Sequence, residues 1–153
     1  MADPHAATAQ ELYRTMMRDR VAPRLRELGW KGSGQRFELP DPRAWVQLGF
    51  QSSRSNSASS LKFTINISVI DRQAWGAHQA EHPGLPAQPN PSTHYGPQFS
   101  PVRIGHLLAA RQDTWWHISA AQPVDRVIRA ANGVVASISD YAMPEIRHRL
   151  GHV

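Results

Sequence analysis

The segment from Ala44 to Ile70 constrains the fold most, because it reads as two antiparallel strands whose side chains alternate in polarity. The apolar members of the alternation are Val46, Leu48, Phe50, Phe63, Ile65, Ile67 and Val69. Successive side chains of a strand point to opposite faces, so one face of this pair is predicted to be apolar and the other polar. The pattern therefore predicts a sheet with one buried face and a second face available for another role.

The size and composition fit one domain. We expect it to span residues 1–153, with an N-terminal tail at 1–7 and a proline-rich loop at 83–101 that holds six of the twelve prolines. The chain has no cysteine, which excludes disulfides and thiolate metal sites. No apolar run approaches the roughly 20 residues of a membrane span, and the N-terminus lacks a basic and then apolar leader. We therefore expect a cytoplasmic protein that contacts no membrane and needs no cofactor.

The net charge of +5 arises from 17 basic residues, nearly all of them arginine, against 12 carboxylates. A basic chain suggests an acidic partner such as nucleic acid. The arginines of the first predicted helix, however, point in several directions at 100° per residue, and Asp19 and Glu27 interrupt them. A continuous stripe that could follow a phosphate backbone is absent from this pattern, so nucleic acid is not the partner we expect.

Helices are predicted at both ends of the chain. The range Thr8–Leu28 opens with a capping box between its first residue and Glu11, and Pro23 inside it predicts a kink or a break. The range Val124–Ala142 carries apolar residues at helical spacing. A short terminal turn of helix is predicted to begin at Pro144.

The remaining segments complete the predicted order of elements. We expect a short strand at Gln35–Leu39, a weak helix at Asp71–Glu81, and a second hairpin formed by Val102–Leu108 and Thr114–Ser119. The order helix, three strands, loop, two strands, helix predicts an α+β domain. Its antiparallel sheet has about five strands, and the N-terminal and C-terminal helices pack on one face.

Four stretches of sequence carry a resemblance to a known family: RVAPRLRELGWKGSGQRFEL, QLGFQSSRSNSASSLKFTINISVI, RIGHLLAARQDTWWHIS and AMPEI. Together they resemble the bacterial family catalogued as domain of unknown function 4304, over nearly the whole chain. The pair Trp115 and Trp116 is the most specific element, whereas Trp30 stands where phenylalanine is expected. The resemblance implies an architecture and a bacterial origin, but no activity, because the family has no assigned catalytic residues.

Two histidine pairs have the i, i+4 spacing that places both rings on one face of a helix, as metal ligands require. The first pair, His78 and His82, lacks the glutamate that directly follows the first histidine in the HExxH signature, although Glu81 lies between the two. The second, His148 and His152, straddles the frayed C-terminus. Since eight histidines make accidental pairs common, the sequence predicts no metal site.

The polar face of the sheet is the candidate site. We expect one contiguous surface for a ligand or partner, formed by Trp45, Gln47, Asn66, Arg103, Trp115 and His117. Two large aromatic rings beside hydrogen-bonding groups suit contact with a ligand or a partner protein. In the alternative interpretation, Trp45 and Trp115 only shield the backbone or are covered by the proline-rich loop.

Three functions remain open. The leading hypothesis is a non-enzymatic binding or interaction module for a protein partner or a small ligand, such as a toxin-neutralising or adaptor protein, and a homodimer is compatible with it. The second is a small-ligand enzyme with His117 as general base and Arg103 as anion anchor. The third is weak nucleic-acid binding through Trp45 and Trp115. No GxSxG elbow or paired carboxylates nominate catalytic residues, so we lean against an enzyme.

Overall fold

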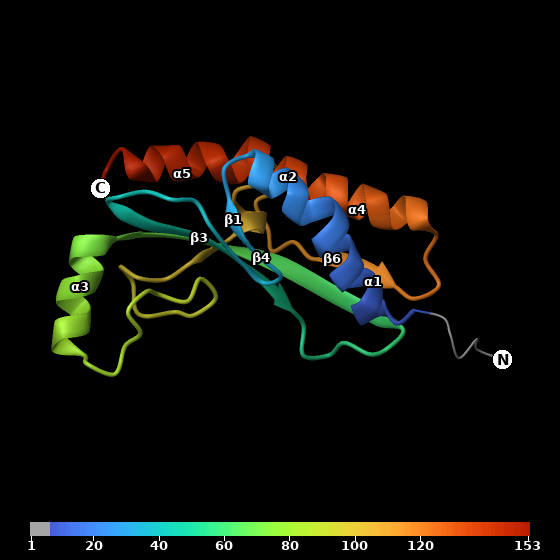
Figure 1. The fold of residues 1–153 in the computed structure, drawn as a ribbon, viewed down its shortest axis with the longest axis horizontal. Coiled ribbons are helices and arrows are strands. Elements are labelled where there is room, and N and C mark those ends of the chain that lie inside the picture. Colours follow the sequence, from blue (N-terminus) through green and yellow to red (C-terminus); the bar gives the residue numbers. More distant parts are fainter. Residues whose placement is uncertain (1–6) are drawn as a thin grey trace.

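The protein, described here by a computed structural model, is an α+β domain in which two long helical segments cover one face of an antiparallel sheet. The structure describes residues 7–153, so the tail expected at 1–7 lies outside the described residues apart from Ala7. Figure 1 shows the helices above the sheet, with α3 and the segment after it on the opposite side. The predicted fold class, with both terminal helices on one face, is confirmed.

Within residues 7–153 the sheet has six strands, one more than expected. They are β1 (Lys31–Ser33), β2 (Arg36–Glu38), β3 (Ala44–Ser52), β4 (Ser60–Asp71), β5 (Val102–Arg103) and β6 (Trp116–Ser119). The order is β1-β2-β3-β4-β5, with β6 also paired to β4, and every pairing is antiparallel. In the central pair Val46 lies opposite Val69 and Gly49 opposite Asn66. This register keeps the apolar residues of both strands on one face.

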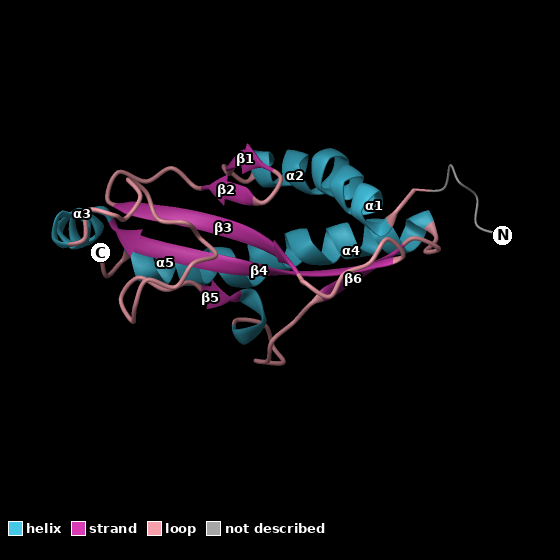
Figure 2. Ribbon diagram, turned by 90° about the horizontal axis from the view of Figure 1, so that it is seen from below, coloured by secondary structure: helices cyan, strands magenta, loops and turns pink. Residues whose placement is uncertain are grey.

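The predicted second hairpin is wrong. Only Val102 and Arg103 are extended, and the chain then forms a 3-10 turn, η2 (Ile104–His106). Strands β5 and β6 do not pair with each other. They lie one after the other along the same edge of the 12-residue β4, β5 at Asn66 and Ile67 and β6 nearer the start of β4 (Figure 2). Because β4 is 12 residues long, one of its edges pairs with two short strands in succession. Strands β5 and β6 therefore do not need to pair with each other.

Each long helical segment continues through a π-helical turn. The first comprises α1 (Ala9–Met16), η1 (Met17–Val21) and α2 (Ala22–Glu27), and the second comprises α4 (Val124–Ser137), η3 (Ile138–Ala142) and α5 (Met143–Leu150). Pro23 and Pro144 are each the second residue after one of these turns. A proline removes one backbone donor and crowds the carbonyl four residues earlier, and the wider turn accommodates both effects. The predicted disruption at Pro23 is therefore a widened turn inside a continuous helix.

The main core lies between this helical layer and the apolar face of the sheet. The sheet contributes Val46, Leu48, Phe50, Phe63, Ile65 and Ile67, each no more than 2% exposed. The ring of Phe63 lies at its centre, with centroids 4.8 Å from Tyr13 of α1 and 5.8 Å from Trp116 of β6. The face assignment made from the alternation is confirmed for these strands.

A second apolar cluster lies on the other face of the sheet. Its buried members are Ile70, Trp75 and Phe99, with Trp45, Leu85 and Tyr95 packed against them. Trp75 belongs to α3 (Arg72–Glu81), which Asp71 caps by accepting from the amide of Ala74 at 2.9 Å. The indole N–H of Trp75 reaches the carbonyls of Pro86 and Ala87, each at 3.3 Å. This cluster holds residues 82–101, the covering segment, against the polar face.

Candidate binding surface

The covering segment buries the middle of the polar face. Gln47 is 1% exposed and Asn66 is 3% exposed, so neither is available to a partner. The closest approach is at Gly49, where an added Cβ would collide with the hydroxyl of Ser92 and lie 3.2 Å from the ring of Pro91. A glycine is needed here because the covering segment packs directly on the strand backbone.

Hydrogen bonds tie the buried polar side chains to the covering segment. The Gln47 amide donates to Gln88 Oε1 at 3.2 Å, and the Asn66 amide donates to Ser92 Oγ at 3.2 Å. Arg36 donates to the carbonyl of Pro89 at 2.8 Å. Buried polar groups without partners cost free energy, so these bonds offset much of the cost of covering a polar face, and Gln47 Oε1 is left buried without a partner among the described residues.

Trp45 lies at the end of the sheet next to α3. The guanidinium carbon of Arg72 is 3.8 Å from the centroid of its ring, a cation–π contact. Trp45 also packs against the second apolar cluster and is only half-exposed. The structure therefore assigns Trp45 a packing role, and it separates this tryptophan from Trp115.

Arg103, Asp113 and Trp115 form an ion-paired cluster at the other end of the face. Arg103 donates to both Asp113 oxygens at 3.0 and 3.1 Å and to Asn66 Oδ1 at 2.9 Å. The indole N–H of Trp115 donates to Asp113 Oδ2 at 2.9 Å. Partial burial acts to raise the pKa of the Asp113 carboxyl, but the hydrogen bonds from Trp115 and Arg103 and the nearby positive charge outweigh it and hold the pKa below its usual value.

Positive charges flank the ring of Trp115. Lys62 Nζ and the guanidinium carbon of Arg103 each lie 5.1 Å from its centroid. These contacts hold the indole in place while leaving it partly exposed. Trp115 is thus presented at the surface, whereas the neighbouring Trp116 points to the core and stacks on Phe63.

A groove of about 570 Å³ runs between β6 and the first turns of α4. It is lined by Ser60, Trp115, Trp116, His117, Ile118, Ser119, Gln122, Arg126, Arg129 and Ala130. His117, Arg126 and Arg129 are exposed. The groove therefore combines tryptophan surface with two guanidinium groups.

The outer edge of β6 carries no partner strand within residues 7–153. Ala120 donates its amide to the Ser59 carbonyl at 2.9 Å, so the next amides directed at β4 belong to Ile118 and Trp116. The amides of His117 and Ser119 point away from β4. That of Ser119 is occupied by Gln122 Oε1 at 2.8 Å. The backbone of His117 remains free to pair with another chain.

The six residues expected at the site therefore do not form one contiguous surface. Gln47 and Asn66 are buried, Trp45 packs under Arg72, and Arg103, Trp115 and His117 lie at the β5–β6 end. Of the two alternatives left open by the sequence, an open face or one covered by the proline-rich loop, the structure shows the middle of the face covered.

Two further residues belong to this end of the face, Lys62 and Asp113, and two more, Arg126 and Arg129 of α4, line the adjoining groove. Lys62 shares the polar face of β4, and Arg126 and Arg129 have the i, i+3 spacing of one helix face. Both patterns are visible in the sequence and could have indicated these residues.

One group in the described part of the chain has ligands for a metal ion close together: His78, Glu81 and His82 at the end of α3. Their ligand atoms all lie within 4.8 Å of one another. The pair His148 and His152 also places its rings near each other, with centroids 4.9 Å apart, but has no carboxylate in such a group.

The geometry of residues 7–153 defines a small α+β domain in which the polar sheet face is covered and the outer edge of β6, which has no partner strand, lies beside basic side chains. The chain belongs to the family described as domain of unknown function DUF4304, whose model matches residues 21–151. No curated protein and no solved structure matches the chain. Among residues 7–153, no helix is long and apolar enough to cross a membrane.

Proposed function

We propose that this protein is a non-enzymatic binding module that holds an extended, acidic segment of a partner protein along β6. The observation that carries the proposal is the free backbone edge at His117, beside a partly exposed tryptophan surface and two exposed arginines in one groove. An unpaired strand edge is a template for a further strand, and natural proteins leave such edges open where a partner completes the sheet.

Backbone and side chains would divide the recognition between them. The N–H and C=O of His117 supply ladder hydrogen bonds, which depend little on the partner's sequence. Arg126 and Arg129 favour carboxylates on the partner through bidentate pairing, and the indole of Trp115 offers rigid apolar contact area. The chemistry thus favours a partner segment in which acidic residues alternate with small or apolar ones.

The alternative of an enzyme with His117 as base and Arg103 as anion anchor finds no support in the geometry. His117 lies opposite Lys62 and Arg103 lies opposite Asn66, four residues further along β4. At about 3.3 Å per residue this separates them by roughly 13 Å along the strand. In addition, Arg103 already pairs with both oxygens of Asp113.

A matched pair of variants at one position tests the backbone part of the proposal. His117→Pro removes the outward N–H without touching the bonds to β4, whereas His117→Ala keeps that N–H and removes only the side chain. The probe is a fluorescent peptide of alternating threonine and glutamate, followed by anisotropy. We expect binding to the wild type and to His117→Ala, and a loss of at least tenfold in affinity for His117→Pro.

Charge reversal tests the side-chain part. Arg129→Glu should weaken binding of the acidic peptide, while Arg147→Glu, an equally exposed change on α5, should leave it unchanged. Equal binding of a lysine–threonine peptide would refute the preference for an acidic partner. Pairing of two copies through β6, measured by sedimentation, or tighter binding of single-stranded DNA than of the peptide, would replace the proposal with a homodimer or a nucleic-acid module.

A further inference from the structure

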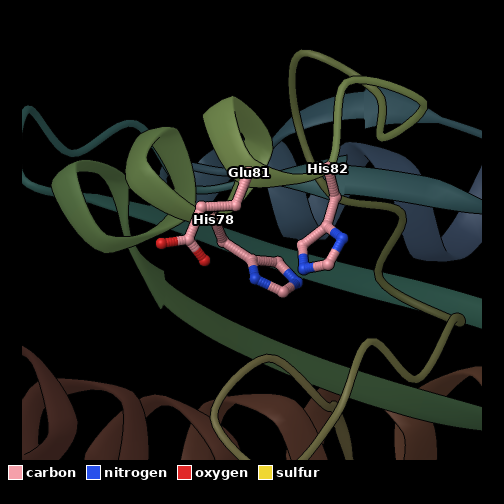
Figure 3. Close-up of side chains that lie close together, drawn as sticks. All are labelled: His78, Glu81 and His82. Atoms are coloured by element: carbon pink, nitrogen blue, oxygen red, sulfur yellow. The ribbon is translucent and has the colours of Figure 1, made fainter.

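The last turn of α3 brings together two imidazoles and a carboxylate. Figure 3 shows His78 and His82 side by side below the helix, with Glu81 close to His78. The ligand atoms of the three residues lie within 4.8 Å of one another, and the two rings have centroids 4.7 Å apart. Glu81 and His82 are exposed and His78 is half-buried, so an ion can reach all three from solvent.

Neighbouring contacts hold the ring of His78 and the backbone of His82 in position. The ring of His78 stacks on Phe99 of the covering segment, with centroids 4.6 Å apart and planes inclined by 23°. The amide of His82 donates to the carbonyl of His78 at 3.0 Å, and its own carbonyl accepts from Leu85 at 3.0 Å. His82 is therefore tied to the helix on one side and to a turn on the other. A ring that is already held by stacking, as that of His78 is, loses little conformational entropy when it binds an ion.

The charge of the group suits a divalent cation. Two neutral imidazoles and one carboxylate carry a net charge of −1, and the carbonyls at the C-terminal end of a helix add negative potential. Imidazole and carboxylate are ligands of zinc and of the neighbouring first-row metals, whereas magnesium and calcium prefer oxygen. We propose that His78, Glu81 and His82 bind a divalent transition-metal ion, with zinc as the representative, and that the ion fastens the end of α3.

The second histidine pair of the chain lacks these features. His148 lies in α5 and His152 in the turn after it, and no carboxylate of residues 7–153 converges with their rings. Arg147 and Arg149 flank His148, and Glu145, the carboxylate in that turn, is paired with Arg149 at 3.0 Å. The local charge there is positive and repels a cation. The two pairs share the i, i+4 spacing, so one serves as an internal control for the other.

This inference departs from the expectation drawn from the sequence, because spacing alone predicts neither the stack on Phe99 nor the convergence of Glu81 with both rings. The order His-x-x-Glu-His also occurs in the inverted zincin motif, in which the glutamate acts as a base rather than a ligand. Here Glu81 lies on an exposed helix end outside the groove of β6. The proposal is therefore a binding site and includes no reaction.

Zinc titration of the untagged protein, followed by calorimetry and by elemental analysis after gel filtration, tests the site. We expect one zinc per chain. His82→Ala should abolish it, Glu81→Gln should lower the affinity about tenfold, and the double change His148→Ala/His152→Ala should leave it unaltered. Zinc at 100-fold over its Kd should raise the Tm by roughly 5 °C or more.

Circular dichroism of each variant without zinc checks the fold, and the exposed positions of Glu81 and His82 make unfolding unexpected. The proposal fails if zinc does not bind, if binding survives His82→Ala, or if the His148/His152 change removes it equally. An affinity unaffected by Glu81→Gln would reduce the site to a bare histidine pair and would also contradict it.

Discussion

Replacing Gly49 with alanine tests whether the covering segment packs on the sheet. Gly49 lies in β3 opposite Asn66 and has no positive φ, so its backbone accepts any residue. On an open sheet face, alanine would stabilise the strand by about 0.5 to 1 kcal/mol relative to glycine. Whether Gly49→Ala raises or lowers the free energy of unfolding therefore depends on which atoms lie next to the new Cβ.

The structure predicts the opposite sign. The new Cβ would collide with Ser92 Oγ and lie 3.2 and 3.3 Å from two ring carbons of Pro91. Ser92 could rotate away only by giving up its hydrogen bond from the buried Asn66, and the ring of Pro91 cannot rotate. Overpacking of this kind costs about 1 to 3 kcal/mol. With the middle of both ranges, Gly49→Ala should lower the free energy of unfolding by about 1 kcal/mol.

Urea denaturation with Gly76→Ala as the control measures this difference. Gly76 lies in α3, where an added Cβ meets no atom within 4 Å, so alanine there should stabilise by about 0.5 to 1 kcal/mol. Combining Gly49→Ala with Ser92→Ala should cost less than the sum of the two single changes, because they share one contact. A Gly49→Ala protein as stable as the wild type, or more stable, would refute the covered face.

Period-two alternation predicts the central pair of strands, and it predicts which side chains of β6 point to the core, because one side of each strand packs against the helical layer. It predicts Trp116 toward the core and Trp115 away from it, as the stack on Phe63 and the contacts with Lys62 show. The same alternation fails after Arg103, where a 3-10 turn begins. Local pattern cannot reveal that β4 has room for two separate partners on one edge.

The covered polar face was harder to foresee, although the sequence holds a signal for it. Ile70 falls on the otherwise polar side of β4, together with Trp45 on β3. Aromatic residues inside a proline-rich loop, Tyr95 and Phe99, need an apolar partner, and these two positions provide it. The path of residues 82–101 depends on that long-range packing, which neither propensity nor spacing contains. For the same reason, the sequence does not predict that the ring of Phe99 stacks on His78.

Three further predictions follow from the core and from the ion-paired cluster. Ile65→Ala should cost about 2 to 5 kcal/mol in urea denaturation, because the side chain is fully buried between sheet and helices, and a loss under about 1 kcal/mol would contradict that burial. Trp116→Ala should cost about 2 to 4 kcal/mol and Trp115→Ala about 1 kcal/mol or less, since only the former ring reaches the core; equal losses would mean that both are core residues. The last concerns pH. The Asp113 carboxyl has a lowered pKa in the folded protein, so it binds a proton less readily there than in the unfolded chain. Its contribution to stability is complete above the pKa of the unfolded chain and is lost as the pH falls through the lowered folded-state value. Asp113→Asn should therefore make the decline of stability on acidification shallower than in the wild type. Because the carboxylate is partly solvated, the difference should also shrink in high salt. The measurement is the free energy of unfolding at a series of pH values. If it falls equally steeply on acidification in the wild type and in Asp113→Asn, the pairing with Arg103 does not contribute to folding.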